Sequence, residues 1–173
     1  MKQSNTALIA LGANLGKPEA AFRRALARLA EEGVEVVAVS GLWRSPAWPE
    51  GSGAPDYTNA VAKLRTDMGA EALLALLHEL EAEAGRRRSV KNAPRELDLD
   101  LLDCGGRVME GELTLPHPRL QWRAFVLLPM WEVEPDWVHP VSGEGVWEMM
   151  GRLGTEAVFA TRRFSSPLGG GGI

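Results

Sequence analysis

The order of strand-like and helix-like segments constrains the fold of this chain more than any other feature. Short apolar or β-branched runs, typical of buried strands, alternate with longer segments that carry alanine or leucine at helical spacing. These patterns predict a strand at 6–12, a helix at 18–32, strands at 34–43 and 57–64, a helix at 70–84 and a strand at 97–102. The β-α-β-β-α-β order favours helices packed on one face of a largely antiparallel sheet, which is the ferredoxin-like α+β sandwich.

Additional strands and helices are expected on the C-terminal side of this unit. The sequence predicts a short hairpin at 105–108 and helices at 119–128 and 144–153. We therefore place one domain at residues 1–153. Residues 154–173 end in LGGGGI and are expected to form a low-complexity, mobile tail.

Composition restricts the class of function. The chain has 173 residues, 45% of them apolar, so it is long enough to bury the core of one domain. A net charge of −4 argues against nucleic-acid binding, which depends on many lysine and arginine contacts to phosphate. The single cysteine excludes a disulfide within the chain, and no signal peptide or membrane span is evident. We expect a cytoplasmic monomer with neither nucleic-acid nor membrane partners.

Two aspartates occupy alternate positions of the last predicted strand, LDLDLL. Because successive side chains of a strand point to opposite faces, Asp98 and Asp100 share one face, ~6.6 Å apart, and leucines fill the other. Neighbouring carboxylates repel each other unless a cation neutralises them, and Mg²⁺ prefers oxygen ligands. The pattern indicates a magnesium site, but it also fits the polar face of an amphipathic strand.

Five positive charges and no acid lie directly upstream, in residues 86–95. Guanidinium groups bind phosphate oxygens through paired hydrogen bonds, so together with the aspartates they favour a Mg²⁺–phosphate site for phosphoryl transfer. Alone, they fit a solvated loop after a helix equally well. His117, in the turn LPHPR, could contact a phosphate or simply shape the turn. Neither a Walker-type phosphate loop nor a G-x-G-x-x-G motif is present, so an ATP site would be of another type.

A second group of residues has the chemistry of a pocket for a flat ring. Tyr57 and Asn59 share a strand face, so an aromatic ring lies beside an amide that both donates and accepts hydrogen bonds. With Phe125 they could stack a heterocycle and read its edge, although an aromatic residue on a strand is more often part of the core. Trp48 lies in a Pro/Gly-rich loop at 45–55 and could cover such a ligand.

Several motifs occur together in one order along the chain. They are LGANL at 11–15, RSP at 44–46, PDYTN at 55–59, KNAPRELDLDLL at 91–102, LPH at 115–117 and RAF at 123–125. With these motifs, residues from about 7 to 153 resemble the 6-hydroxymethyl-7,8-dihydropterin pyrophosphokinase family. The family's fold is the ferredoxin-like sandwich, in agreement with the order of elements.

The resemblance implies an activity and a role for each motif. The activity would be transfer of pyrophosphate from ATP to the pterin hydroxymethyl group, with release of AMP, in tetrahydrofolate synthesis. The catalytic group would be two Mg²⁺ ions held by Asp98 and Asp100, with Arg86 and Arg95 neutralising charge. The nucleotide would be bound by Leu74, His78, Glu81, Arg86, Arg88, Arg95, His117 and Arg123. The pterin pocket would comprise Tyr57 and Phe125 as a sandwich, Asn59 at the ring edge, and Ser45, Pro46 and Trp48 at the border.

Two other functions remain open on the residues alone. A module that only binds a small ligand would leave the aspartate pair and the arginines unused. The other is a Mg²⁺-dependent nucleotidyl- or phosphotransferase with another acceptor, although Tyr57, Asn59 and Phe125 favour a flat heterocycle instead. Incubation with ATP, Mg²⁺ and the pterin separates these two functions from pyrophosphate transfer. AMP would indicate pyrophosphate transfer, ADP would indicate an ordinary kinase, and no turnover would favour the binding module.

Overall fold

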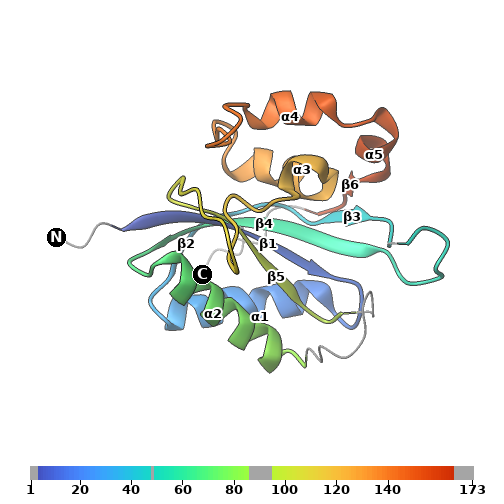
Figure 1. The fold of residues 1–173 in the computed structure, drawn as a ribbon. Helices are drawn as coiled ribbons and strands as arrows, with labels where there is room; N and C mark the ends of the chain where they lie inside the picture. Colours follow the sequence, from blue (N-terminus) through green and yellow to red (C-terminus); the bar gives the residue numbers. More distant parts are fainter. Residues whose placement is uncertain (1–3, 48, 86–94, 166–173) are drawn as a thin grey trace.

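The computed structural model describes residues 4–47, 49–85 and 95–165, and it confirms a ferredoxin-like α+β sandwich (Figure 1). Within these residues the strands are β1 (Asn5–Ala13), β2 (Glu35–Val39), β3 (Trp43–Ser45), β4 (Tyr57–Thr66), β5 (Asp98–Cys104) and β6 (Arg162–Arg163). All their pairings are antiparallel, in the order β5-β1-β4-β3-β6, and β2 also pairs with β4. The central strands of the predicted sheet are therefore confirmed.

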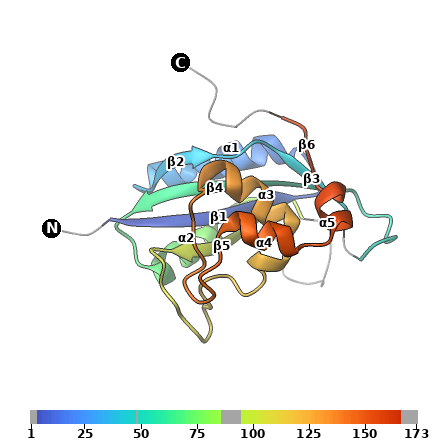
Figure 2. The same cartoon turned by 90° about the horizontal axis from the view of Figure 1, so that it is seen from above.

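Helices cover both faces of the sheet (Figures 1 and 2). On one face lie α1 (Pro18–Glu31) and α2 (Ala70–Glu83); on the other lie a 3-10 turn η1 (Leu120–Trp122), α3 (Ala124–Val133), α4 (Val146–Arg152) and α5 (Thr155–Ala160). Pro18 begins α1, where its fixed φ suits the first helical position and its missing N–H costs no hydrogen bond. None of the helices in the described part of the chain is long and apolar enough to cross a bilayer.

The sheet separates two apolar layers, because side chains alternate along each strand. Ile9 and Leu11 of β1 pack into the layer beneath α1 and α2. Leu8 packs into the layer beneath α3 and α4. Gly12 lies on the same face as Leu8 by this alternation. The polar residues beside Gly12 in the register therefore face the α3 side of the sheet.

Two predicted elements are divided in the structure. The strand expected at 34–43 is broken at Ser40, whose buried Oγ accepts a hydrogen bond from the Val61 N–H at 3.0 Å, and β2 and β3 pair with successive parts of β4. The helix expected at 119–128 is interrupted at Arg123, which has extended φ and ψ of −118° and 106° and stands before α3. This break directs Arg123 toward the sheet rather than along a helix face.

The C-terminal side also differs from the expectations. The chain turns at Gly105 and Gly106, as predicted, but in the structure residues 107–115, all of them described, do not form the second strand of a hairpin. Met109 forms only an isolated bridge with Leu115. The helix expected at 144–153 is present as α4. Within the segment expected to be a tail, residues 155–163 form α5 and β6, and β6 pairs with β3. Residues 166–173 lie outside the described part of the chain.

Candidate active site

The two aspartates lie at the start of β5, at the edge of the sheet. Asp98 pairs with Gly12 in the register and Asp100 pairs with Ala10. Leu99 and Leu101 are buried in the layer beneath α1 and α2, so the alternation expected from the sequence is confirmed. Both aspartates face the opposite side, toward α3, and are partly exposed.

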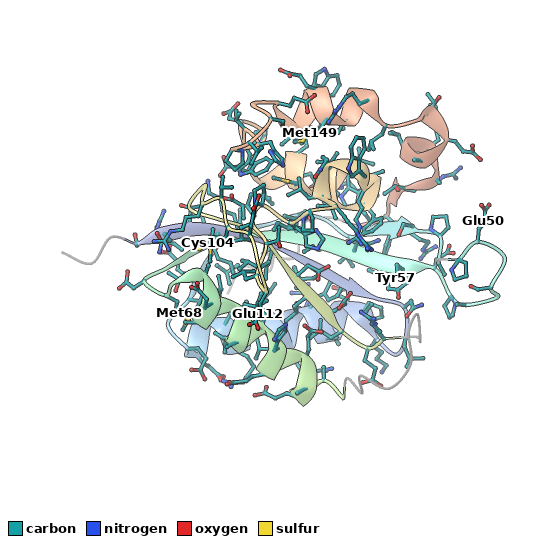
Figure 3. The ribbon with its side chains drawn as sticks, viewed as in Figure 1. Glu50, Tyr57, Met68, Cys104, Glu112 and Met149 are labelled. Atoms are coloured by element: carbon teal, nitrogen blue, oxygen red, sulfur yellow. The ribbon has the colours of Figure 1, made fainter. Side chains whose placement is uncertain are left out.

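Gly12 lies between the two groups of residues predicted from the sequence, the aspartate pair and the Tyr57–Asn59 pair. In the register it lies between Asp98 of β5 and Asn59 of β4. A Cβ on Gly12 would lie 3.7 Å from Asn59 Oδ1, 3.9 Å from Tyr57 Cδ1 and 4.0 Å from Asp98 Cβ. The side chains of Tyr57, Asn59 and Asp98 therefore surround the space directly above Gly12. Figure 3 shows Tyr57 at the end of the sheet opposite Cys104, beside the loop that carries Glu50.

The Asn59 amide is held in one orientation by β3. Its Nδ2 donates to Ser45 Oγ at 2.9 Å and to the Trp43 carbonyl at 3.4 Å, and both Asn59 and Ser45 are buried. Because the amide nitrogen is engaged, Oδ1 is the end that lies near Gly12. The site therefore presents a hydrogen-bond acceptor to whatever fills the space beside Tyr57.

Tyr57 is half-buried, and nearby charged residues affect the pKa of its phenol. Burial is the largest cause that raises the pKa of its phenol; the Asp98 charge raises it further, and Arg95 lowers it. The phenol thus stays neutral at physiological pH, and its ring offers an uncharged face for stacking. The geometry around Gly12 places the ring near Asp98, which forms the ion pair with Arg95.

Arg95 is fixed to the site by both its side chain and its backbone. Its Nη1 forms an ion pair with Asp98 Oδ1 at 3.1 Å. Its backbone N–H donates to Asn14 Oδ1 at 2.8 Å, and its carbonyl accepts from the Asn14 N–H at 3.0 Å. The buried Asn14 also donates Nδ2 to the Pro55 carbonyl at 3.3 Å, so it joins the arginine side to the start of the Tyr57 strand.

Asn14 is a residue that the sequence interpretation left without a role. The LGANL motif pointed to this position, but its contacts are with residues 41 and 81 positions away. The spacing of residues within the motif could not have shown these long-range hydrogen bonds. The local signal for it is an asparagine placed in the turn after a predicted strand, because such side chains often bond to nearby backbone groups.

His117 and Arg123 approach the aspartates from the α3 side. The His117 Nδ1 accepts a hydrogen bond from the Arg119 N–H at 3.1 Å, so in the neutral ring Nε2 carries the proton and is the donor. Burial lowers the pKa of His117 to about 4, assisted by the charges of Arg123 and Arg119. Arg123 Nη1 lies 4.0 Å from Asp100 Oδ2, and burial lowers the pKa of its guanidinium.

Phe125 shares the α3 side with these groups. It packs against the apolar layer between the sheet and α3, and the guanidinium of Arg123 lies 5.5 Å from the centre of its ring. Tyr57 faces the same layer by strand alternation from Asn59 and Val61. The structure thus places both predicted stacking residues on one side of the sheet.

Three of the remaining predicted residues lie on the opposite side of the sheet. Leu74, His78 and Glu81 lie on α2, which covers the opposite face; Leu74 packs on the core, His78 is exposed, and Glu81 is buried. Pro46 is exposed directly after Ser45. Trp48, Arg86 and Arg88 lie outside the described residues. The nucleotide roles of the α2 residues stay predictions.

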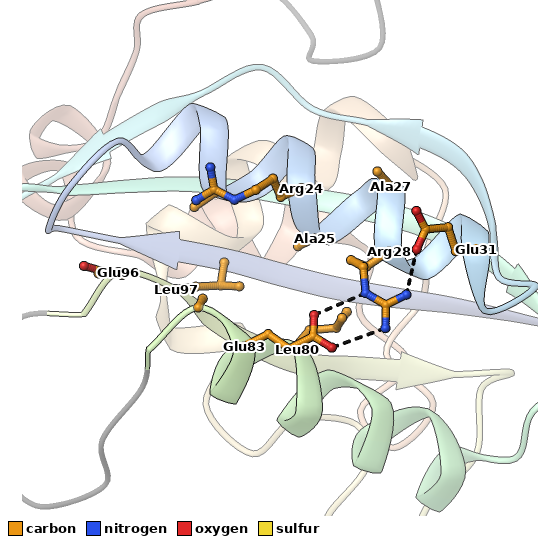
Figure 4. A pocket seen from close by; sticks show the side chains of 11 residues that line it. Arg24, Ala25, Ala27, Arg28, Glu31, Leu80, Glu83, Glu96 and Leu97 are labelled. Carbon is orange, nitrogen blue, oxygen red and sulfur yellow. Dashed lines mark hydrogen bonds and ion pairs between the residues drawn. The ribbon is translucent and has the colours of Figure 1, made fainter.

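A groove of about 400 Å³ between α1 and α2 is a separate feature (Figure 4). Arg28 of α1 crosses it to form two hydrogen bonds of 3.2 Å with Glu83 of α2, and one of 2.7 Å with Glu31. Ion pairs therefore join the two helices there. Among the described residues, none of those predicted for the active site lines this groove.

The fold and the site define a ferredoxin-like protein in which aromatic, amide, carboxylate and guanidinium groups gather on one face of the sheet. The model of the family described as 7,8-dihydro-6-hydroxymethylpterin-pyrophosphokinase matches residues 8–135. The chain belongs to this family, as its sequence motifs predicted.

Individual relatives agree with this assignment. The chain is 39% identical over 160 residues to the 2-amino-4-hydroxy-6-hydroxymethyldihydropteridine pyrophosphokinase of Synechocystis sp., covering 91% of this chain and 81% of that protein. It is 39% identical over 140 residues to the Haemophilus influenzae enzyme of the same name, covering 79% and 86%.

Longer proteins contain a similar unit. The chain matches 18% of the length of the folic acid synthesis protein fol1 of Pneumocystis carinii, at 36% identity over 78% of this chain. The crystal structure of Plasmodium falciparum HPPK-DHPS with pteroate is similar with a TM-score of 0.70 at 11% identity, over 87% of this chain and 42% of that one. The latter likeness shows the fold.

Proposed function

We propose that this chain transfers pyrophosphate from ATP to the hydroxymethyl group of 6-hydroxymethyl-7,8-dihydropterin, with Mg²⁺, as a cytoplasmic monomer in folate synthesis. The reaction joins the hydroxymethyl oxygen to the β-phosphorus and breaks the bond between the β-phosphorus and the oxygen bridging it to the α-phosphorus, so AMP is the second product. Family membership supports the reaction. The meeting of Tyr57, Asn59 and Asp98 around Gly12 is the observation that carries it, because it sets a ring pocket against a carboxylate.

The donor set fits Mg²⁺. Asp98 and Asp100 offer carboxylate oxygens from one face of β5. Among the described residues no group of three or more His, Cys, Asp or Glu could hold a metal ion. Mg²⁺ usually takes one or two carboxylates and completes its shell with water and substrate phosphates, so a pair is sufficient. When bound, two Mg²⁺ ions would neutralise phosphate charge and align the reacting oxygens.

The chain's own cations would hold the polyphosphate from two directions. Arg95 approaches from the loop before β5, where Asn14 fixes its backbone. Arg123 approaches from the start of α3, next to Asp100. His117 would donate from Nε2, since Nδ1 already accepts a hydrogen bond. Catalysis in such a site consists mainly of positioning and charge neutralisation.

The pterin side would be formed by an aromatic face and one acceptor. Tyr57 and Phe125 would stack on the ring, and Asn59 Oδ1 would accept an N–H of its edge. Ser45 and Pro46 would border the pocket. Binding both substrates on the α3 face brings the hydroxymethyl group toward Asp98, because Tyr57 and Asp98 both lie within 4.0 Å of the same point.

One assay tests the proposal. The protein is incubated with ATP, Mg²⁺ and the hydroxymethyl pterin, and the nucleotides are separated. AMP in equal amount to the pterin diphosphate is expected. ADP instead would show an ordinary kinase, and no turnover would show a module that only binds its ligand. Omission of the pterin is the control, because AMP formed without it would report ATP hydrolysis.

A further inference from the structure

The C-terminal residues 161–165, here called the C-terminal clamp, are seated on β3 (Figures 1 and 2). Arg163 pairs with Trp43 and Arg162 with Arg44. The Phe164 N–H donates to the Leu42 carbonyl at 2.9 Å. The Leu42 N–H donates to Ser165 Oγ at 3.2 Å. The segment expected to be a tail thus completes the edge of the sheet next to the pterin pocket.

Glu132 of α3 ties the clamp to β3. One carboxylate oxygen accepts from Trp43 Nε1 at 2.6 Å and from Arg163 Nε at 3.0 Å. The other accepts from the Gly41 N–H at 3.2 Å and from Arg163 Nη2 at 3.3 Å. The Glu132 side chain is only 20% exposed, so these charge-assisted hydrogen bonds are partly shielded from water.

Gly41 shows that the seat for the clamp is specifically shaped. A Cβ at this position would lie 2.4 Å from the Ser165 carbonyl oxygen and 2.8 Å from Arg163 Nε and Nη2. Such distances are too short for any side chain, and a backbone oxygen cannot swing away as a flexible side chain can. The clamp therefore occupies space that only glycine leaves free.

The strand held by the clamp is the one that orients Asn59. β3 lies between β6 and β4 in the sheet. From β3 the Trp43 carbonyl and Ser45 Oγ accept the Asn59 amide protons, and Ser45 pairs with Tyr57 in the register. β3 has only three residues and therefore few backbone hydrogen bonds to β4. Its position also depends on the support that β6 gives to its other edge.

We propose that the C-terminal clamp is a positioning element for the pterin side of the site. Through Glu132 and the ladder to β6 it holds β3 in place, so that Ser45 keeps the Asn59 amide turned with Oδ1 toward the ring. The choice of ligand rests on the proposed function, whereas the link from clamp to β3 rests on the contacts alone. Arg163 and Glu132 touch no substrate; they act through Trp43 and Ser45.

A pair of truncations tests the proposal. One ends the chain after Ala160 and removes the clamp; its control ends after Ser165 and keeps it. The shorter chain is expected to raise the KM for the pterin by about three- to tenfold, the equivalent of one hydrogen bond. The KM for ATP and kcat should stay within about twofold. The control should match the full chain. A pterin KM that is equal in both truncations overturns the proposal.

A point variant removes the clamp from its seat without shortening the chain. Gly41→Ala should displace Arg163 and Ser165, whereas Gly151→Ala, whose Cβ would have nothing within 4 Å, is its control. The readout without ligand is the hydrogen exchange of the Trp43 indole N–H by NMR, assigned with Trp43→Phe. Gly41→Ala should speed this exchange and raise the pterin KM together.

The remaining outcomes are also decisive. Faster indole exchange with an unchanged pterin KM overturns the proposal, as does an equal rise of both KM values, which would mean general destabilisation. A full-length chain that forms no AMP overturns the proposed function and the pterin role with it. The indole exchange would then still decide whether the clamp holds β3, so the two failures are distinguishable.

Discussion

Asn59 donates its amide N–H to Ser45 Oγ at 2.9 Å, and this contact helps to fix which end of the amide faces the space beside Tyr57. A free asparagine can turn either its oxygen or its nitrogen toward a ligand. Here the nitrogen is occupied on β3, and the oxygen lies toward Gly12. The proposed pterin pocket would therefore select a ring edge that donates a hydrogen bond.

Ser45→Ala should weaken pterin binding without touching the ring. Loss of the hydroxyl leaves the Asn59 Nδ2 with the longer bond to the Trp43 carbonyl, so the amide can rotate. We expect a loss of about 0.5–1.5 kcal/mol in pterin binding, the net value of one hydrogen bond. Calorimetry with a non-hydrolysable ATP analogue present measures it. Ser142→Ala, in an exposed loop, is the matched control; equal affinity in both variants would contradict the role of Ser45.

Gly12→Ala should preserve the fold and impair the site. The nearest atoms to the added Cβ lie at 3.7–4.0 Å, an ordinary van der Waals distance, so the folded chain accepts the methyl group. The methyl would take space between Tyr57, Asn59 and Asp98 that the pterin needs. We expect pterin affinity to fall by about 1–3 kcal/mol, as for overpacking of a close-fitting cavity, and Gly12→Val to reduce it further. The melting temperature of Gly12→Ala should stay near that of the parent; unchanged affinity across the series would refute the placement of the ring.

The sheet could be predicted from the sequence because its signals are local. Alternating leucine and aspartate identify the two faces of β5, and Tyr57 and Asn59 share a face for the same reason. These signals depend on neighbouring residues only. The order of elements then left few ways to assemble the sheet.

The parts that were missed depend on contacts between distant segments. Asn14 joins Arg95 to Pro55, and Glu132 joins Trp43 to Arg163. Neither set of contacts leaves a periodic pattern in the amino-acid sequence. The sequence does not predict the C-terminal clamp, because its strand is only two residues long and lies shortly before a run of glycines. Its stability comes from β3 and Glu132 rather than from its own propensity.

Asp98→Asn should abolish turnover while the chain stays folded. The substitution keeps the size of the side chain but removes the charge that a cation needs. A bound metal contributes several kcal/mol to phosphoryl transfer, so a loss of at least about 100-fold in kcat is expected. The Arg95–Asp98 ion pair is partly exposed and contributes only ~0–1 kcal/mol to stability. AMP release measures activity and circular dichroism measures the fold. Asp136→Asn, which is exposed between α3 and α4, is the control; near-normal AMP release by Asp98→Asn would exclude the metal role.

His117 should make the free energy of unfolding depend on pH. Its pKa is lowered to about 4 in the folded chain, from 6.5, with burial as the main cause. Between these values the unfolded chain binds a proton that the folded chain does not. Stability from this group is therefore complete above pH 6.5 and is lost as the pH falls from 6.5 toward 4.

The variant His117→Asn tests this dependence. Asparagine can still accept the Arg119 N–H through Oδ1 but does not titrate. Urea unfolding is measured above pH 6.5 and again between pH 4 and 6.5. The parent chain should lose more stability between the two conditions than His117→Asn, because His139 titrates equally in both proteins. An equal loss in the parent and His117→Asn would show that His117 is not held neutral by its surroundings.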